Sequence, residues 1–365
     1  MLTIYNNIKR ILKNRLLKSF AIVTKDINTN QSFVTIGALK SCVRYKAVYL
    51  GKDANVITTL IIRFNILKFL KRFHDTTGLV IINDPSLAAL NRNLFLMQPE
   101  FIVLEIPLPD TIDEYLKSIT KDAKNNLKKL EKIGFTCTIS NDKNWVDIFY
   151  NDYYVPTMID RHSEDAALVP KSEMLAIVNN TGAEFVKLFL DGKCVAAAVT
   201  ILENDNYCCI KIGYLKGELN LLQKGIVTAI YKFRIQRAYE LGCKTIILGG
   251  TPPFLENGVF TYKAKWQARF CPEKYYTENY LLLNPQNKYC YEFLRNNSLV
   301  VFGLQNRLIV LSSKNPNETK ISGNILNDIN CWYILRESRV ENYSSGMEDL
   351  PEHLRYWYER YYDIN

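Results

Sequence analysis

The stretch that decides the fold lies at residues 242–270 and reads GCKTIILGGTPPFLENGVFTYKAKWQARF. Its first part, KTIILGG, is the short apolar run of a buried strand, and it ends in two glycines that are soon followed by two prolines. A segment rich in aromatic residues comes next and carries Lys263 and Lys265. A strand end without side chains, close to two lysines, indicates a site that handles an anionic group.

Three strands before this stretch are expected to form an antiparallel meander. They are EFVKLFL at 184–190, KCVAAAVTI at 193–201 and NYCCIKIGY at 206–214. Asp191 and Gly192 are the residue pair of a two-residue hairpin between the first two strands. A helix from Leu222 to about Leu241 then leads to KTIILGG. The strands on either side of this helix are expected to be parallel neighbours.

The region before the meander is predicted to begin with a helix. Thr111 and Glu114 form a capping box, and Gly134 ends the helical pattern. Apolar residues recur in it every three or four positions, the spacing of one helix face: Leu116, Ile119, Ala123, Leu127, Leu130 and Ile133. FTCTIS at 135–140 follows as a short strand.

Two further helices are expected at 144–160 and 171–180, divided by Pro156 and by the polar segment 161–170. EKYYTENYLLL at 273–283 closes the series as a last strand. This order predicts an α/β (α+β) fold with a mixed, mostly antiparallel sheet flanked by helices, in which one helix joins two neighbouring parallel strands. Such an order of elements resembles the GNAT acyltransferase fold.

Four segments sharpen this resemblance. They are KDAKNNLKKLEKIGFTCTIS at 121–140, DGKCVAAAVTI at 191–201, RAYELGCKTIILGG at 237–250 and NGVFTYKAKWQARF at 257–270. In this order they are similar to the FemAB-like branch of the GNAT superfamily. That branch typically has a basic helix before the first strand of its catalytic domain, an Asp-Gly hairpin, a strand ending in Gly-Gly and a Gly-x-x-x-(Phe/Tyr)-Lys segment. The likeness covers residues 105–285.

A degenerate, partial copy of the same fold is expected before residue 105, as in the double-GNAT arrangement of that branch. Its elements would be strands at 42–51, 79–83 and 100–106 and helices at 60–78 and 85–96. The expected domains are therefore 1–105 with the basic N-terminal helix and the partial copy, 106–290 with the acyltransferase fold, and 291–365 as a C-terminal appendage. The tail EDLPEHLRYWYERYYDIN at 348–365 is predicted to be one aromatic helix.

The start of the helix near Gln223, Lys224 and Gly225 is a candidate phosphate site. Free N–H groups at a helix N-terminus attract anions, and glycine lets a ligand approach the backbone. In GNAT enzymes the pyrophosphate of CoA lies here, on a Q/R-x-x-G-x-G/A loop. This sequence keeps a fragment of that pattern, because Ile226 and Thr228 stand in place of a second glycine. The alternative is that Gly225 only caps the helix.

The resemblance also assigns roles at the end of the strand 244–250. Lys263 takes the position of the family's lysine near the donor, where its charge would offset negative charge on the donor or in the transition state. Gly249 and Gly250 would line the approach. Lys265 is interpreted as a surface charge.

In this fold, backbone N–H groups of the third meander strand commonly stabilise the oxyanion, which here points to Ile212 and Gly213. Tyr214 would reprotonate a leaving thiolate, or it is a packing residue.

The segment PTMIDRHSED supplies the candidates for the acceptor side of the reaction. His162 and Glu164 are the candidate general bases, since an amine must lose a proton as it is acylated. Arg161 would hold an acceptor carboxylate, with Asp160 beside it. The alternatives are a solvated loop and a base supplied by water or by the substrate.

The net charge and the cysteine content indicate which partners and which cellular compartment suit the protein. The net charge of +9 suits a nucleotide, a CoA phosphate, tRNA or an acidic surface equally. Nine cysteines without a CxxC pair favour reduced thiols over a zinc site or a disulfide framework, which points to the cytoplasm and to no metal.

No segment is apolar over the roughly 20 residues that a membrane span needs. Residues 1–20 are predicted to be a basic amphipathic helix that docks on the body of the protein with a solvated face, or that makes peripheral contact with the inner membrane surface or RNA. The lysines at 117–132 are a solvated face or an electrostatic guide for CoA or tRNA.

Two hypotheses about function follow. The first is an N-acyltransferase that passes an acyl group to an amine on a small molecule, a peptide or a cell-envelope precursor. Acyl-CoA is favoured slightly over aminoacyl-tRNA as the donor, because the chain lacks a long coiled-coil arm, and a FemAB-type aminoacyltransferase is the alternative. The second is a non-catalytic binding protein on the same scaffold, in keeping with the incomplete pyrophosphate loop.

Overall fold

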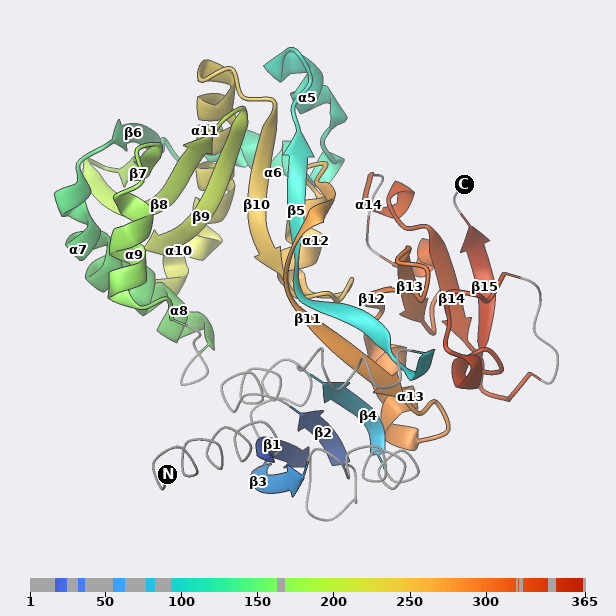
Figure 1. The fold of residues 1–365 in the computed structure, drawn as a ribbon. Helices are drawn as coiled ribbons and strands as arrows, with labels where there is room; N and C mark the ends of the chain where they lie inside the picture. The colour runs from blue at the N-terminus through green and yellow to red at the C-terminus, as the bar shows by residue number, and fades with distance from the viewer. Residues whose placement is uncertain are drawn as a thin grey trace, which may run out of the picture.

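The computed structural model describes residues 17–24, 32–36, 55–62, 77–82, 93–162, 168–319, 321, 324–340 and 346–363 (Figure 1). Its strands form one continuous mixed sheet. The main path through this sheet is β3-β1-β2-β4-β11-β5-β10-β9-β8-β7-β6, and β12 to β15 branch off beside β5.

The seven strands that carry the candidate site occupy one end of that path. They are β5 (Leu96–Pro107), β6 (Thr136–Ser140), β7 (Ala183–Leu190), β8 (Lys193–Glu203), β9 (Asn206–Tyr214), β10 (Thr245–Thr251) and β11 (Arg269–Leu283). Their neighbouring pairs are antiparallel, except that β9 and β10 are parallel. Helix α11 (Ile226–Glu240) connects β9 to β10. This arrangement confirms the fold class and the parallel pair predicted from the sequence.

The predicted helix after Thr111 is two helices, α5 (Ile112–Ser118) and α6 (Lys121–Glu131). Thr111 caps the first, as predicted, and accepts from the N–H of Glu114 at 3.3 Å. The prediction of one continuous helix was wrong because Thr120 is extended and caps the second helix, where its Oγ1 accepts from the N–H of Ala123 at 3.3 Å.

Pro156 does not interrupt the helix in which it lies. A π-helical turn at Phe149–Tyr154 runs directly into α8 (Val155–His162), so Pro156 is the second residue of a continuing helix. The N–H of Val155 bonds to the carbonyl of Tyr150, five residues back, and this wider turn accommodates the proline ring. Helix α9 (Lys171–Val178) follows after the segment 163–167.

The first part of the chain repeats the pairing of the main unit. Its strands are β1 (Leu17–Thr24), β2 (Ser32–Ile36), β3 (Asn55–Ile62) and β4 (Thr77–Ile82). β1 and β2 are antiparallel and β2 and β4 are parallel, as β8, β9 and β10 are.

Residues 17–20 and 60–62 were predicted as helix but are strand, because β1 and β3 pair with each other along their whole length. Residues 77 and 78, predicted as the end of the helix at 60–78, are also strand and begin β4, whose residues 79–82 were predicted as strand. Leu96, predicted as the end of the helix at 85–96, begins β5. The strand predicted at 42–51 and the predicted helical residues 1–16, 63–76 and 85–92 lie outside the described residues.

The C-terminal residues extend the sheet next to β5. Their elements are α13 (Lys288–Asn296), β12 (Leu299–Phe302), β13 (Leu308–Ser312), α14 (Asn324–Asn327), β14 (Cys331–Leu335) and β15 (Tyr358–Asp363). The predicted aromatic helix at 348–365 was wrong. Its residues form a short 3₁₀ turn and then β15, which pairs with β14. Aromatic residues favour strands, and Tyr358 is fully buried in this pairing.

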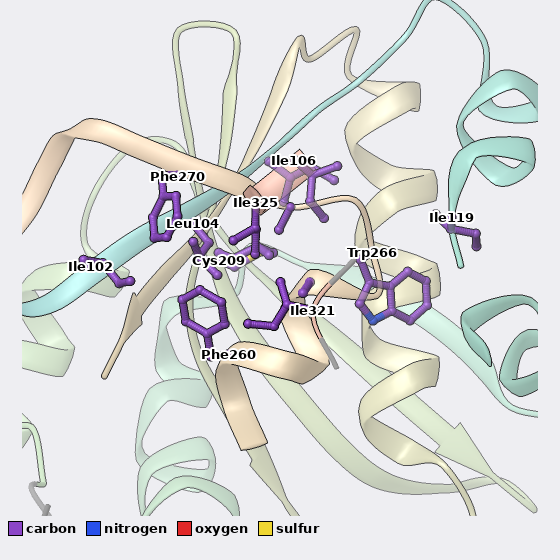
Figure 2. Packing of buried hydrophobic residues seen from close by; sticks show 14 of the residues in the cluster. Ile102, Leu104, Ile106, Ile119, Cys209, Phe260, Trp266, Phe270, Ile321 and Ile325 are labelled. Atoms are coloured by element: carbon purple, nitrogen blue, oxygen red, sulfur yellow. The ribbon is translucent and has the colours of Figure 1, made fainter. Parts of the chain in front are cut away.

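A large apolar core holds α12 (Gly258–Ala264) under β5 and β10 (Figure 2). Trp266 is 1% exposed, and its carbonyl accepts from the Tyr115 hydroxyl at 2.9 Å. Phe260 packs in the same cluster as Ile102 and Leu104 of β5. The end of β10 and the segment that carries Lys263 are therefore fixed relative to one another.

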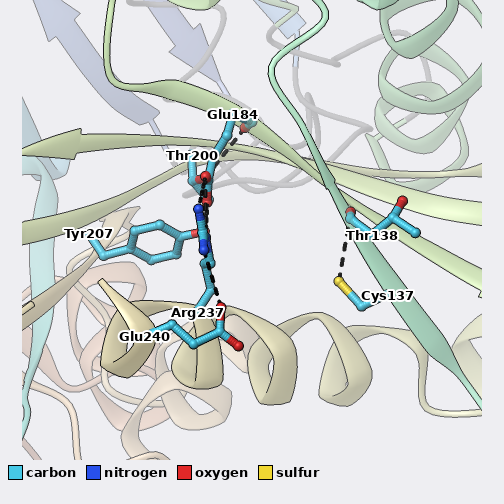
Figure 3. Close-up of polar contacts among 7 residues, drawn as sticks. All are labelled: Cys137, Thr138, Glu184, Thr200, Tyr207, Arg237 and Glu240. Atoms are coloured by element: carbon cyan, nitrogen blue, oxygen red, sulfur yellow. Dashed lines mark hydrogen bonds and ion pairs between the residues drawn. The ribbon is translucent and has the colours of Figure 1, made fainter. Parts of the chain in front are cut away.

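A buried polar network fixes α11 against β7 and β9 (Figure 3). The Glu184 carboxylate accepts from Nε and Nη2 of Arg237 at 3.2 and 3.1 Å and from the Tyr207 hydroxyl at 2.7 Å. Thr200 of β8 donates to the same tyrosine oxygen. Because each of these side chains comes from a different element, the network sets the position of α11 over the sheet.

Candidate active site

The candidate active site is a cleft where β9 and β10 separate. The two strands pair as far as Cys208 and Ile247, after which no pairing between them continues. β10 changes register against β5 between Ile247 and Gly250, which turns its end away from β9. Between the diverging ends lies an open cavity of about 580 Å³. Its wall includes residues of α8, β9, α11, β10 and α12.

The predicted oxyanion strand forms one wall of this cleft. Ile212 lines the cavity, in keeping with the prediction, and the edge of β9 beyond Cys208 has no strand partner on the side of β10. Gly213 is not among the lining residues. A Cβ on Gly213 would lie 2.5 Å from the carbonyl carbon of Tyr153, so this glycine allows the π-helical turn to pack on β9.

The mouth of the cleft is formed by the N-terminus of α11. Gly225, the N-cap, has φ of 80°, a conformation that favours glycine, and it has no side chain with which to cap the helix. The first-turn N–H groups of α11 have no acceptors within the helix. Gly225 and Thr228 line the cavity, whereas Gln223 and Lys224 are exposed at the end of α10 (Leu219–Gln223) and outside its wall. The helix terminus is therefore available to an anion, with Lys224 next to it.

Lys263 lies against the end of β10, where the two glycines predicted a site for an anionic group. Its Nζ donates to the carbonyls of Gly249 and Gly250 at 2.9 and 3.1 Å and to Oγ1 of Thr251 at 2.6 Å. The side chain is almost fully buried, and this burial lowers the pKa of Lys263 to about 7. All three Nζ contacts are with the protein, so Lys263 shapes the strand end. Gly250 also lines the cavity, as predicted.

Lys265 lies apart from the cleft. Its Nζ pairs with Asp122 at 2.5 Å, and both side chains are largely exposed. This agrees with its interpretation as a surface charge.

Arg234 of α11 is a cleft residue that the sequence reasoning missed. It is 3% exposed and lines the cavity, and its Nη2 donates to the carbonyls of Val199 and Lys211 at 3.1 and 3.0 Å. A signal for it was present in the sequence. Ile226, Ile230, Arg234 and Ala238 follow one another at intervals of four residues and form one buried helix face, in which an arginine is the exception.

The structure describes some, but not all, of the residues that were predicted to bind or deprotonate the acceptor. Arg161 lines the cavity, as the prediction for a substrate-binding residue requires. Asp160 accepts from the Tyr214 hydroxyl at 3.1 Å. Tyr214 is fully buried and is not among the lining residues; its burial raises the pKa of its phenol. The side chain of His162, and Glu164 entirely, lie outside the described residues, so their role as bases stays a prediction.

Aromatic side chains close the α12 side of the cleft. The rings of Tyr231 and Tyr262 meet edge to face at 5.3 Å, and Tyr231 stacks on Trp266 at 5.2 Å. The hydroxyl of Tyr262 lies 3.1 Å from Oγ1 of Thr228. Burial raises the pKa of Tyr262 to about 12, so its phenol is neutral near pH 7. This wall suits the apolar and amide parts of an extended ligand.

Within the described ranges, no three His, Cys, Asp or Glu side chains are placed to bind a metal together. The helices of the same ranges include none whose length and apolar character would let it cross a bilayer.

The fold is that of a GNAT-like sheet, which is mixed and mostly antiparallel, with the crossover helix α11 joining the parallel strands β9 and β10. No family model matches the sequence, and no curated protein does. Solved structures similar to this chain include the following three, each at low identity. They are FemX (13% identity, covering 75% of this chain and 90% of FemX, TM-score 0.37), L-PGS from Bacillus licheniformis (12%, 75% and 84%, 0.36) and a GCN5-related N-acetyltransferase from Kribbella flavida (7%, 74% and 57%, 0.30). At these scores the fold assignment rests on the strand order of this chain.

Proposed function

We propose that this protein is an N-acyltransferase that takes an acyl group from acyl-CoA and passes it to an amine in the cleft between β9 and β10. The observation that carries the proposal is the cleft itself. One open cavity joins the free N-terminus of α11, the unpaired edge of β9 at Ile212 and the glycine end of β10 at Gly250. A phosphate site, an oxyanion site and a narrow passage between them are what transfer from a long phosphorylated thioester requires.

In this reaction the amine nitrogen attacks the thioester carbonyl, and a C–N bond forms as the C–S bond breaks. The amine proton passes to a base, for which His162 and Glu164 are the candidates, and CoA leaves as the thiol after protonation. The backbone of β9 near Ile212 would stabilise the oxyanion. Arg161 on the opposite wall would orient the acceptor.

The pyrophosphate of the donor would lie against the first turn of α11, beside Gly225 and Lys224. The helix terminus has no side-chain cap of its own, which leaves its N–H groups for a ligand. The pantetheine arm would then run past Thr228 and Tyr262 toward the end of β10. Gly250 permits this passage because it presents no side chain to the cavity.

A transfer assay tests the proposal. The protein is incubated with acetyl-CoA and with longer acyl-CoAs, each with a panel of amines that includes amino acids, polyamines and short peptides, and the release of free thiol is followed. Gly250→Leu, which places a side chain in the passage, should abolish release, while Lys265→Met should not change it. Charged tRNAs are tested in parallel. Transfer from aminoacyl-tRNA, with no release from any acyl-CoA, would contradict the proposed donor, and no transfer from either would contradict an enzymatic role.

A further inference from the structure

The cleft wall contains two buried basic residues, Arg234 and Lys263. Arg234 is 3% exposed and Lys263 is 5% exposed, and both line the cavity. Among the described residues, no carboxylate forms a hydrogen bond or an ion pair with either of them. Buried charges in proteins are normally paired, because a charge removed from water without a partner is strongly destabilising. The unpaired guanidinium of Arg234 therefore calls for an anion from outside the protein, whereas Lys263, with its pKa lowered to about 7, can lose its charge instead.

The guanidinium of Arg234 is only partly used by the protein. Nη2 donates to the carbonyls of Val199 and Lys211, where β8 and β9 change register, so part of its role is to hold these strands. Nε is buried and has no acceptor, and no described residue accepts from Nη1. A neutral hydrogen-bonding side chain would serve two carbonyls equally well. The charge of Arg234 and the donors of its Nη1 are thus left for a ligand.

The position of Arg234 along α11 indicates which part of a ligand it meets. Arg234 lies nine residues beyond Gly225, which places it about 13 Å deeper along the helix axis than the N-terminus at the mouth. A donor whose phosphates lie at the mouth would carry its acyl end into this region. Arg234 and Cys209 also line a separate small hollow of about 10 Å³, whose other walls include Ile106, Ile235 and Ile246. Because this hollow holds no more than about one water molecule, it leaves no room for a long chain beyond Arg234, and the group that reaches Arg234 is short.

From this geometry we propose that the inner end of the cleft binds a carboxylate carried by the acyl group, and that the donor is the thioester of a short dicarboxylic acid, with Arg234 as the carboxylate-binding residue. The proposal rests on the acyl-CoA function proposed above and specifies its substrate class. Arg234 binds the carboxylate directly, and the hydrogen bonds of Lys263 keep the end of β10 in place.

Equilibrium binding of matched thioesters tests this proposal. Succinyl-CoA and butyryl-CoA have acyl chains of the same length, and they differ in whether a carboxylate ends the chain. Wild-type protein should bind succinyl-CoA at least tenfold more tightly, since hydrogen bonds to charged groups are the strong ones. Arg234→Gln should reduce this preference to within about twofold. Lys232→Gln removes one positive charge from the same helix outside the cleft wall and should keep the preference.

The other possible results distinguish failure of the carboxylate site from failure of the proposed acyl-CoA function. Equal binding of the two thioesters by the wild-type protein would overturn the carboxylate site and leave the acyl-CoA function in place, and this comparison decides the question even if Arg234→Gln fails to fold. A succinyl preference that persists in Arg234→Gln would also overturn it. No binding of either thioester or of CoA would overturn the proposed function. If the thioesters bind alike while an amino acid binds more tightly than its amide, and Arg234→Gln removes that difference, the carboxylate belongs to the acceptor and the assignment to the acyl group is wrong.

Discussion

The Nζ of Lys263 lies 2.9 Å from the carbonyl oxygen of Gly249, fourteen residues earlier in the chain. This contact, with those to Gly250 and Thr251, joins α12 to the end of β10. It explains why two glycines and a lysine occur together in the sequence. The glycines leave the strand end without side chains, and the lysine donates to the carbonyls of both glycines.

Replacing Lys263 should therefore lower the free energy of unfolding, because its contacts hold the cleft wall. Lys263→Met keeps the length of the side chain but leaves two carbonyls and a hydroxyl without their donor, and each buried unsatisfied group costs about 1–3 kcal/mol. The free energy of unfolding, measured with urea, should fall by at least that amount. Lys265→Met is the control: its pair with Asp122 is exposed, so the loss should stay below about 1 kcal/mol. Equal losses in the two variants would contradict the role of Lys263.

The stability of the wild-type protein should depend on pH through Lys263. Burial lowers the pKa of this lysine from 10.5 to about 7, with Cys209 and Arg234 as its charged or titratable neighbours. Between these values the unfolded chain binds a proton that the folded chain does not, so the free energy of unfolding rises with pH. Relative to Lys263→Met, the wild-type protein should gain stability between pH 7 and pH 10 in urea titrations. A constant difference, or a change in the opposite direction, would contradict the lowered pKa.

Gly213 should tolerate no side chain. In Gly213→Ala the new Cβ would lie 2.5 Å from the carbonyl carbon of Tyr153, a backbone atom that cannot move aside cheaply. The substitution should lower the free energy of unfolding by about 1–3 kcal/mol, as overpacking does. Gly258→Ala, where nothing lies within 4 Å, should have little effect on stability. Thermal midpoints of the two variants measure the contrast, and a neutral Gly213→Ala would contradict the close packing of the π-helical turn on β9.

The pair of Arg237 and Glu184 should contribute more to stability than the surface pair beside it. Glu184 is 8% exposed, so Arg237→Met leaves a buried carboxylate with the Tyr207 hydroxyl but without its cation. The expected loss is about 1–3 kcal/mol, less than for a fully buried pair because Arg237 is partly exposed. Glu240→Gln removes the exposed partner of the same arginine and should cost less than about 1 kcal/mol. If the two substitutions cost the same, the network does not hold α11.

Much of the main unit could be predicted from the sequence because its signals are local. The hairpin at Asp191–Gly192, the cap at Thr111 and the apolar run of β10 each depend on neighbouring residues, and each was found where the pattern placed it. The tail at 348–365 could not be predicted in this way. Its aromatic spacing fits a helix face, but β15 forms because β14 offers it a partner, and that partner is distant in the sequence.

The residues of the candidate site also divide into those that have a local signal in the sequence and those whose position depends on tertiary packing. Gly225 and Gly250 were chosen as candidates because a glycine near a helix start and glycines at a strand end are visible in the sequence, whereas the role of Lys263 came from the resemblance to the FemAB-like branch. Gly213 was assigned to the oxyanion site, but its position next to Tyr153 depends on the packing of a π-helical turn, which no local pattern reveals. Arg234 was missed for a related reason. Its burial becomes significant only once the separation of β9 and β10 places it on the wall of a cavity.

The most direct test of the central claim is the thermal midpoint of the wild-type protein with millimolar CoA, acetyl-CoA and a longer acyl-CoA. A ligand present at 100 times its dissociation constant stabilises the folded state by about 2.7 kcal/mol, which corresponds to a rise of a few degrees. The account predicts such a rise for the wild-type protein and its loss in Gly250→Leu, whose side chain would fill the passage, provided that this variant keeps its unliganded midpoint. An unchanged midpoint with every CoA compound would contradict a donor site between β9 and β10.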